Sequence, residues 1–509
     1  MANKRLFSSL RTRNSEGSPA YAFDPKHALA QYAATGCLNG SFYASAETQL
    51  DELLQMAHEV DAEFVARVAV YSREQAHMKD APAVLLAHLA QRDVLLFDRI
   101  FDRVIDSTRM LRTFVQILRS GVTGRRSFGS YPKRVVRRWF ARRTDDALFR
   151  GSVGNSPSLA DIIHMIHPRP DSPAREALFG YLINKNYDHD ALPSLVQEYE
   201  AFKGDPTGSP PNVPFAMLTS LPLTREHWAA IARSMPWTAL RINLNTLLRH
   251  RAYEVDGVAD EVAARIRSAE EIRRAKAMPY QLLVAVHHVN AEMPRVIVDA
   301  LHDALEIAVR NVPKVDGPVH VCPDVSGSMS WPVTGFRGSA SSAVMCVDVA
   351  ALVAAAFLRT NPQATVLPFE DRVVKLRLDP RDTIATNAEK LRQVGGGGTN
   401  CSAPLAQLNR KRATGNLVVI VSDNESWVDA TDMNQTSLMM EWKLYKRRNP
   451  HAKLACLDIV ANRTTQALER NDILNLGGFS DRTFEILALL HKGQLTPDHW
   501  VGVIENIEI

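Results

Sequence analysis

A short apolar stretch ends in one carboxylate, and two hydroxyl side chains follow it at alternate positions. The segment reads Val319-His-Val-Cys-Pro-Asp-Val-Ser-Gly-Ser-Met-Ser330, so Asp324, Ser326 and Ser328 follow a run that is typical of a buried strand. Gly327 lets the loop after such a strand turn tightly. Three oxygen ligands around one point suit Mg2+ or Mn2+, which prefer octahedral oxygen coordination that retains water. This spacing predicts a divalent-cation site.

Two later segments supply further oxygen ligands. The run Gly395-Gly-Gly-Gly-Thr399 predicts a flexible loop that delivers one hydroxyl, and Asn416-Leu-Val-Val-Ile-Val-Ser-Asp423 predicts a second buried strand that ends in a carboxylate. Ligands of open α/β sheets lie at the carboxyl ends of the strands, so we expect Thr399 and Asp423 to join the first three residues there. The alternative is a loop whose hydroxyls cap a helix and form turns without a metal.

The set Asp-x-Ser-x-Ser, Thr and Asp resembles the metal-ion-dependent adhesion site of von Willebrand factor A domains. The resemblance implies that these residues hold one Mg2+ or Mn2+ and that a carboxylate from outside the chain, or water, completes the coordination. The expected metal ligands are Asp324, Ser326, Ser328, Thr399 and Asp423.

The composition describes a globular chain with more than one domain. It has 509 residues, of which 46% are hydrophobic and 23% are charged, and its formal net charge is +4. A chain of this length exceeds what one hydrophobic core usually organises. Five scattered cysteines without a Cys-x-x-Cys pair disfavour a disulfide framework and a zinc site, and they favour a reducing compartment. Since no apolar run is long enough to span a membrane, we expect a cytoplasmic protein without a membrane partner.

Four segments are expected along the chain. Residues 1–22 begin with a basic stretch that lacks the apolar core of a secretory signal, which predicts a flexible basic arm, with a short transit peptide as the alternative. Residues 23–313 show helical spacing of apolar side chains between proline-marked breaks, as in a helical-repeat solenoid, although no strict repeat period is visible. Residues 314–490 alternate strands and helices, as in a doubly wound α/β domain. Residues 491–509 are expected to form a tail that packs back on the first domain.

The expected elements of the α/β segment follow from apolar runs and helical spacing. The expected strands are 319–322, 365–368, 372–376, 417–422 and 454–460, with a final strand between 472 and 485. The expected helices are 343–359, 387–393, 403–411 and 437–448.

A basic stretch without any acidic residue lies between Ser107 and Thr144. A helix over residues 132–143 would place Val135, Val136, Trp139 and Phe140 on one face and the basic residues on the other. A basic surface without a compensating acid is most stable against a polyanion, and arginine suits phosphate. The expected nucleic-acid contacts are Arg125, Arg126, Lys133, Arg134, Arg137, Arg138, Arg142, His164 and His167. The alternative is an ordinary solvated basic helix.

No catalytic arrangement can be argued from the sequence. No base is placed near Ser326 or Ser328, and no Ser-His-Asp, Cys-His or paired-carboxylate pattern occurs. Metal-assisted hydrolysis is a third hypothesis. A site whose coordination is completed by an outside carboxylate or water describes adhesion better than catalysis.

A basic helical region followed by a von Willebrand factor A domain resembles the Ro autoantigen (TROVE domain) family. Met235-Pro-Trp-Thr-Ala-Leu-Arg-Ile-Asn-Leu244 is similar to the family's Pro-x-Thr-Ala-Leu-x-Arg-Asn-Leu element, with Arg and Ile exchanged in order. Ala277-Met-Pro-Tyr-Gln-Leu-Leu283 is similar to its His-Pro-Phe element. Further family elements match Gly397-Gly-Thr-Asn-Cys-Ser-Ala-Pro404, Val421-Ser-Asp-Asn-Glu-Ser426 and Gly477-Gly-Phe-Ser-Asp481. The resemblance is to bacterial members of the family, and the matching elements follow one another in the family's order.

The resemblance implies a multidomain α and α/β fold, in which a HEAT-like toroid of helices is closed by the α/β domain. It implies a non-catalytic ring that binds small non-coding Y RNA on its outer basic surface and single-stranded 3′ ends of misfolded RNAs in its central cavity. The implied roles are RNA quality control, RNA maturation or degradation, and stress survival together with a 3′-to-5′ exoribonuclease.

The RNA contacts transfer by region rather than by motif. The family's Lys-Asp-Leu-Leu-Arg-Leu run appears here as Ala160-Asp-Ile-Ile-His-Met165, so the contact residues differ in identity. The alternative function is a metal-dependent protein-adhesion scaffold without RNA as its main ligand.

Overall fold

The computed structural model describes residues 12–36, 43–124, 126–154, 156–275, 277, 279–310, 312–333, 344–428, 435–495 and 499–509. By their packing, these residues divide into two compact units. The α/β unit comprises the described parts of Met1–Ala81, Met278–His287 and Leu305–Glu508, and the helical unit comprises those of Pro82–Ala277 and His288–Ala304. The first helices therefore pack with the sheet, so this division differs from a single boundary at residue 313.

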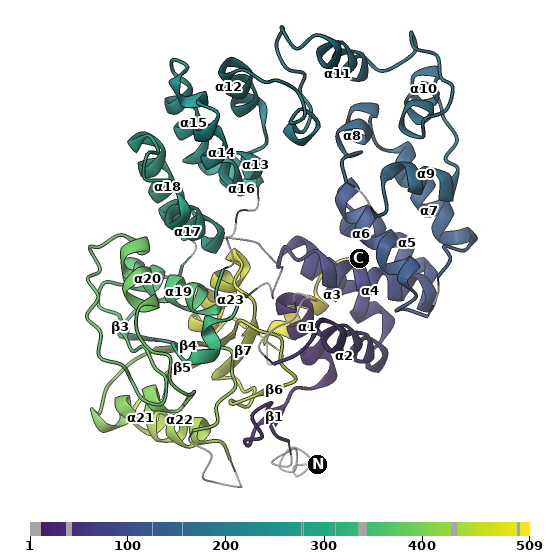
Figure 1. The fold of residues 1–509 in the computed structure, drawn as a ribbon. Coiled ribbons are helices and arrows are strands. Elements are labelled where there is room, and N and C mark those ends of the chain that lie inside the picture. Colours follow the sequence, from purple (N-terminus) through teal and green to yellow (C-terminus); the bar gives the residue numbers. More distant parts are fainter. Residues whose placement is uncertain are drawn as a thin grey trace. The chain divides into compact units, whose positions relative to one another are not determined.

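A five-stranded parallel sheet forms the centre of the α/β unit (Figure 1). Its strands are β2 (Val319–Pro323), β3 (Thr365–Val366), β4 (Leu417–Ser422), β5 (Lys453–Asp458) and β7 (Ile473–Gly477). They lie in the order β3-β2-β4-β5-β7. Because β2 is the first of them in sequence and has β3 on one side and β4 on the other, the strand order reverses at β2. Doubly wound sheets bind ligands at such a point, beyond the carboxyl ends of the strands.

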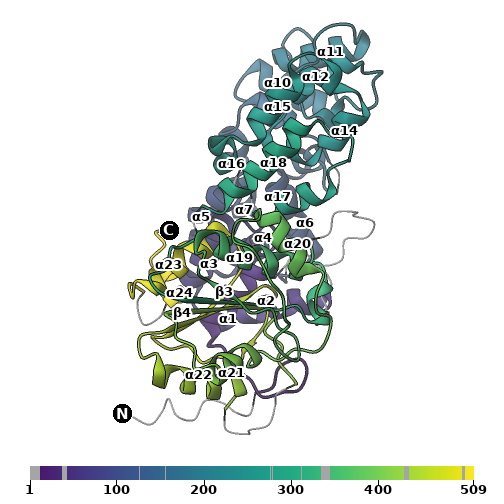
Figure 2. The same ribbon diagram turned by 90° about the vertical axis from the view of Figure 1, so that its left-hand side faces the viewer.

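Helices cover both faces of this sheet (Figure 2). α19 (Cys346–Thr360) and α20 (Ile384–Arg392) lie on one face, and α21 (Ala403–Arg410) and α22 (Ser437–Arg448) lie on the other. β2 and β4 are buried at every residue, as strands covered on both faces should be. Alternate residues of the strands, among them Cys322, Val418 and Ile420, share a core with Trp442 and Tyr445 of α22. These elements and the helices described below confirm the expected fold class, a helical region followed by a doubly wound α/β domain.

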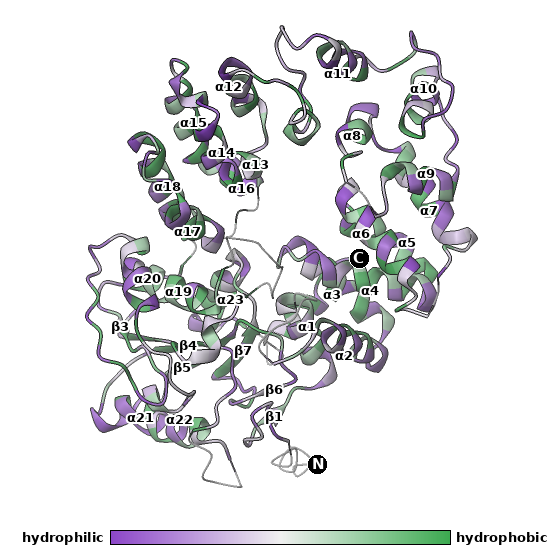
Figure 3. Ribbon diagram, in the orientation of Figure 1, coloured by the Kyte–Doolittle hydropathy of each residue, from purple (hydrophilic) through white to green (hydrophobic). Residues whose placement is uncertain are grey.

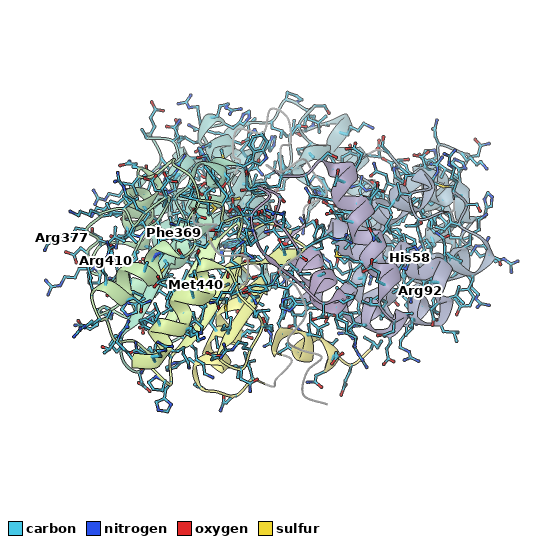
Figure 4. The ribbon with its side chains drawn as sticks, turned by 90° about the horizontal axis from the view of Figure 1, so that it is seen from below. His58, Arg92, Phe369, Arg377, Arg410 and Met440 are labelled. Carbon is cyan, nitrogen blue, oxygen red and sulfur yellow. The ribbon has the colours of Figure 1, made fainter. Side chains whose placement is uncertain are left out.

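The strand expected at residues 372–376 is wrong. Val373 forms only an isolated bridge with Phe369, and the Val374 N–H donates to the Pro368 carbonyl oxygen at 2.7 Å. The chain therefore folds back on the end of β3 instead of adding a strand. Phe369 is fully buried, whereas the charged residues that follow point outward, as Arg377 does at the rim of the α/β unit in Figure 4.

Residues 12–22 pack against the α/β domain, which corrects the flexible arm expected there. β1 (Tyr21–Ala22) pairs antiparallel with β6 (Thr464–Thr465). The Asn14 side chain is buried, and its Nδ2 donates to the Ser426 carbonyl oxygen at 2.7 Å. The polar groups of this segment thus find partners in the α/β domain, which a count of basic residues does not reveal. The start of the expected arm, residues 1–11, lies outside the described residues.

Three early helices and the last helix also belong to the α/β unit: α1 (Pro25–Thr35), α2 (Ala46–Glu59), α3 (Ala62–Glu74) and α24 (His499–Glu505), beside α23 (Asp481–His491). α1 lies against β7, and Gln31 Nε2 donates to Asp458 Oδ2 at 2.8 Å. A Cβ at Gly477 would lie 2.4 Å from Gln31 Oε1, so a larger residue would force the Gln31 side chain or α1 to shift. Trp500 of α24 is fully buried beside Tyr71 of α3.

Helices follow one another from α4 to α18 without a strand in the part of the chain that the structure describes. In Figure 3 hydrophobic and hydrophilic residues alternate around α5 and α6, and Phe97, Phe101 and Phe114 pack between these two helices. None of the described helices is both long and apolar enough to cross a membrane. The helices are α4 (Asp80–Arg92), α5 (Val94–Val104), α6 (Thr108–Ser120), α7 (Ser130–Ala141), α8 (Asp145–Arg150), α9 (Leu159–Ile166), α10 (Pro173–Leu182), α11 (Ser194–Gly204), α12 (Arg225–Ser234), α13 (Trp237–Ile242), α14 (Leu244–Arg249), α15 (Val258–Ile266), α16 (Ala269–Arg274), α17 (Pro279–His288) and α18 (Arg295–Ala308).

Candidate functional site

Asp324 and Asp423 follow neighbouring strands at the point where the strand order reverses. Asp324 comes directly after β2, and Asp423 comes directly after β4. The two strands are parallel and in register, with Pro323 opposite Val421, so both aspartates lie at the same edge of the sheet. Both side chains are buried. The sheet topology thus brings together the two carboxylates that the motif singles out.

Hydroxyl groups connect these two carboxylates. Ser422 Oγ donates to Asp324 Oδ2 at 2.6 Å, and the Ser326 backbone N–H donates to Asp324 Oδ1 at 2.8 Å. Ser328 Oγ donates to Asp423 Oδ2 and lies 3.3 Å from Ser326 Oγ. One network of oxygen atoms therefore joins both aspartates to both serines of the motif.

The glycine run packs tightly against the serine loop, residues 324–330. The Gly396 N–H donates to the Val325 carbonyl oxygen at 2.8 Å, and the Gly327 N–H donates to the Gly397 carbonyl oxygen at 2.9 Å. Thr399, at the end of the run, is buried, and its carbonyl oxygen accepts the Trp427 N–H at 3.1 Å. Thr399 is thus held between the glycine run and the segment that follows Asp423.

Gly395→Ala is expected to lower the stability of the α/β unit by about 1–3 kcal/mol more than Gly396→Ala does, as for an overpacked site. Both glycines have a positive φ, 95° and 110°, but a Cβ at Gly395 would lie 2.1 Å from the Val325 carbonyl oxygen, while one at Gly396 meets nothing within 4 Å. Thermal unfolding of the two variants separates the steric clash from the backbone strain that they share. Equal losses of stability would show that the close approach contributes nothing.

Burial raises the pKa of both aspartates. The pKa of Asp324 rises to about 7, first because of burial and then because of the negative charge of Asp423. Burial also raises the pKa of Asp423, although the Ser328 hydroxyl opposes the shift. Burial and the charge of Asp423 raise the pKa of Glu425, two residues further on, to about 8. No lysine or arginine among the described residues forms an ion pair with Asp324 or Asp423, so their charge lacks a protein counterion there.

The donor set fits a hard divalent cation. Two carboxylates and the hydroxyls of Ser326, Ser328 and Thr399 are oxygen ligands of the kind that Mg2+ and Mn2+ prefer. No group of three His, Cys, Asp or Glu residues with metal-binding geometry occurs within the described ranges, so a metal at this edge of the sheet would depend on the hydroxyls. Two buried carboxylates without a counterion are the feature that a cation would satisfy.

Two residues of this centre are not part of the sequence motif. Ser422 is the last residue of β4, and its position directly before Asp423 could have suggested it. Tyr43 Oη donates to Asp423 Oδ2 at 3.2 Å, across 380 positions of sequence. Burial and the charge of Asp423 raise the pKa of Tyr43 above its ordinary value, so its hydroxyl stays a donor. No local pattern could have revealed this contact.

Helix α7 has the two faces that the sequence predicts. Val135, Val136, Trp139 and Phe140 are buried. The guanidinium carbon of Arg134 lies 4.4 Å from the centroid of the Tyr131 ring. The other basic residues of this face are Lys133, Arg137, Arg138 and Arg142.

Two aspartates of α5 compensate part of the basic face of α7. Arg138 forms an ion pair with Asp98, and Arg142 forms one with Asp102. The Arg138 guanidinium holds the pKa of Asp98 below its usual value. The expectation that no acid compensates this face is therefore wrong, because the acids come from a neighbouring helix and not from the basic stretch itself.

Basic residues from several segments line one pocket of about 830 Å³ at the start of α7. They come from the end of α6, the loop before α7, α7 itself, and α9 with the residue that follows it. Among the described residues no aspartate or glutamate lines this pocket. Five of the expected nucleic-acid contacts thus lie together, and Arg119, which was not among them, joins the group. The six basic residues of the pocket are Arg119, Arg126, Lys133, Arg137, His164 and His167.

Local contacts hold two sides of this pocket. Arg137 Nε donates to the Ile166 carbonyl oxygen at the end of α9. His167 ends that helix in the left-handed conformation with φ 48° and is exposed. Ser158 is the N-cap of α9. The carboxylate of Asp161, three residues later, accepts from the Ser158 N–H at 2.8 Å and completes a capping box. Arg125, the remaining residue expected in this loop, lies outside the described residues.

The fold and the oxygen-ligand centre define a class of protein, a helical region joined to a von Willebrand factor A domain. Residues 319–490 match the Ro60 vWA domain. The chain is 24% identical over 521 residues to the RNA-binding protein RO60 of Deinococcus radiodurans, covering 95% of this chain and 96% of that protein. It is 25% identical over 204 residues to the RNA-binding protein RO60 of Caenorhabditis elegans, covering 38% of this chain and 31% of that protein.

A solved structure shows the same fold. The crystal structure of the Deinococcus radiodurans RO (RSR) protein superimposes with a TM-score of 0.62 at 22% sequence identity, covering 93% of this chain and 100% of that chain. Together with the sequence relatives, this match confirms the resemblance to the bacterial Ro proteins that the motifs indicate.

Proposed function

We propose that this protein binds RNA through the pocket at the start of α7 and the basic residues around it. The observation that carries the proposal is the convergence of six basic side chains on one pocket that no described acid lines. Such a surface attracts phosphates and releases their counterions, which makes binding strong and salt-dependent. The names of the two relatives, both RNA-binding proteins, support this assignment.

The similarity to bacterial Ro proteins supports a narrower form of the proposal. Its RNA ligands are Y RNA and the single-stranded 3′ ends of misfolded or structured RNAs, which the protein binds without cleaving them. In this proposal it acts in the cytoplasm with a 3′-to-5′ exoribonuclease, in RNA quality control, RNA maturation or degradation, and stress survival. Recognition by shape and phosphate is the mode that a pocket of arginines, lysine and histidines supports.

We also propose that Asp324, Ser326, Ser328, Thr399 and Asp423 hold a divalent cation, Mg2+ or Mn2+. The buried carboxylates without a counterion support this part. The same centre supports the second candidate function, a protein-adhesion scaffold in which a partner's carboxylate completes the coordination.

An electrophoretic mobility shift titration with two RNAs at two salt concentrations tests the proposal. One RNA is a duplex with a single-stranded 3′ tail, and the other is the same duplex with blunt ends. We expect tighter, salt-sensitive binding to the tailed RNA, which should remain intact. Absence of binding to either RNA would favour the adhesion scaffold, and cleavage would favour the hydrolase.

A further inference from the structure

Tyr43 lies at the candidate metal centre although it belongs to the segment before α2. Its Oη donates to Asp423 Oδ2 at 3.2 Å, the same oxygen that the Ser328 hydroxyl contacts. The Tyr43 side chain is partly buried there. A phenol of the chain itself thus lies against one of the two carboxylates of the centre.

Residues near the N-terminal end of the described chain hold the neighbouring loop. Asn14 Nδ2 donates to the Ser426 carbonyl oxygen at 2.7 Å, and the Ser15 N–H donates to Glu425 Oε2 at 2.8 Å. Asn462 Nδ2 donates to the Asp423 carbonyl oxygen at 2.6 Å. Early segments of the chain therefore contact Asp423, through Tyr43, and also Glu425 and Ser426.

Adhesion-type centres leave a coordination position for a carboxylate from a partner, as the sequence motif implies. We propose that Tyr43 screens this centre from within the chain. The centre then accepts a cation but disfavours a carboxylate from outside the chain. This inference rests on the metal centre proposed above and is independent of RNA binding.

The chemistry of the contact favours such selectivity. The phenol O–H is a neutral donor, so it satisfies Asp423 without cancelling the negative charge that attracts a cation. An outside carboxylate that binds a cation beside Asp423 meets the Tyr43 side chain, whose hydroxyl already occupies one side of Asp423 Oδ2. The phenol oxygen is no comparable obstacle to a cation, because it is a neutral oxygen atom that a cation can approach.

The test is a Mn2+ titration of the full chain, followed by water-proton relaxation, with acetate as the carboxylate probe. Acetate that reaches bound Mn2+ displaces water and lowers the relaxation enhancement. We expect Tyr43→Ala to bind acetate at its Mn2+ centre about tenfold more tightly than the unmodified protein, a change of about 1.4 kcal/mol. Tyr43→Phe removes only the hydroxyl and should lie between the two.

Tyr32→Phe is the matched control, because the Tyr32 hydroxyl also donates to a carboxylate, that of Glu52, outside this centre. It should leave acetate binding unchanged. Equal acetate affinity in the unmodified protein and both Tyr43 variants, with Mn2+ bound in all, would overturn the screening role alone. Absence of Mn2+ binding in every variant would overturn the metal centre and the screening role together. The proposed RNA binding would not be affected, because the RNA titration tests it separately.

Discussion

Replacing Lys133 and Arg137 together by glutamine is expected to weaken RNA binding by about 10- to 100-fold at physiological salt. If each side chain neutralises one phosphate of a single strand, the slope of log affinity against log salt should shrink by about 1.4, at ~0.7 per phosphate. Both residues line the pocket at the start of α7. Mobility shift titrations of the tailed RNA at several salt concentrations measure both effects, which should be similar across RNA sequences.

Arg138→Gln with Arg142→Gln is the matched control on the same helix. It removes the same formal charge, so the long-range attraction for RNA falls equally. These two side chains already pair with Asp98 and Asp102, however, so fewer phosphate contacts should be lost. A control pair that weakens binding as much as the pocket pair would show that the whole basic face of α7 contacts RNA. An unchanged slope in the pocket pair would remove the pocket from the interface.

Asp324→Asn is expected to be more stable than the unmodified protein without a metal and less stable than the unmodified protein with Mg2+. With a chelator present, the variant should unfold at a higher temperature than the unmodified protein, since one of two neighbouring buried charges is gone. With Mg2+ at about 100 times its dissociation constant, the unmodified protein should gain about 2.7 kcal/mol and the variant almost nothing. Calorimetric scans with EDTA and with Mg2+ measure both changes.

Asp458→Asn provides the control for this experiment. Asp458 is also a buried aspartate, at the carboxyl end of the next strand, β5, but it is not part of the metal motif. Its asparagine variant should keep the full response to Mg2+, whatever its own stability. If Asp324→Asn still responds to Mg2+ like the unmodified protein, the cation does not bind where we propose.

The sequence predicted those features that short-range patterns determine. Apolar runs that end in Asp324 and Asp423 identified β2 and β4, and parallel pairing at a reversal of strand order then placed both carboxylates at one edge. Helical spacing likewise identified the buried face of α7. The short apolar run at residues 372–376 was misleading, because such a run also fits a segment that folds back over the end of a strand.

Contacts between distant segments could not be predicted in the same way. Arg138 and Asp98 are 40 positions apart, and Tyr43 and Asp423 are 380 apart. No periodicity relates such pairs, since each depends on how separate helices and loops pack. The pocket at the start of α7 could be predicted only in part. Five of its basic residues were among the expected contacts, but their convergence on one pocket requires the packing of α6, α7 and α9.

The pairing of β1 with β6 has a consequence for the biosynthesis of the chain. Tyr21 leaves the ribosome long before Thr465, its partner in this pairing, has been made. At about 5–20 residues per second, the interval of about 440 residues lasts roughly 20–90 s. During that time α1, whose Leu29 and Ala30 are fully buried in the finished protein, has no β7 to cover it. The buried face of α1 therefore lacks its partner in the sheet until the segment that contains β6 and β7 has been made.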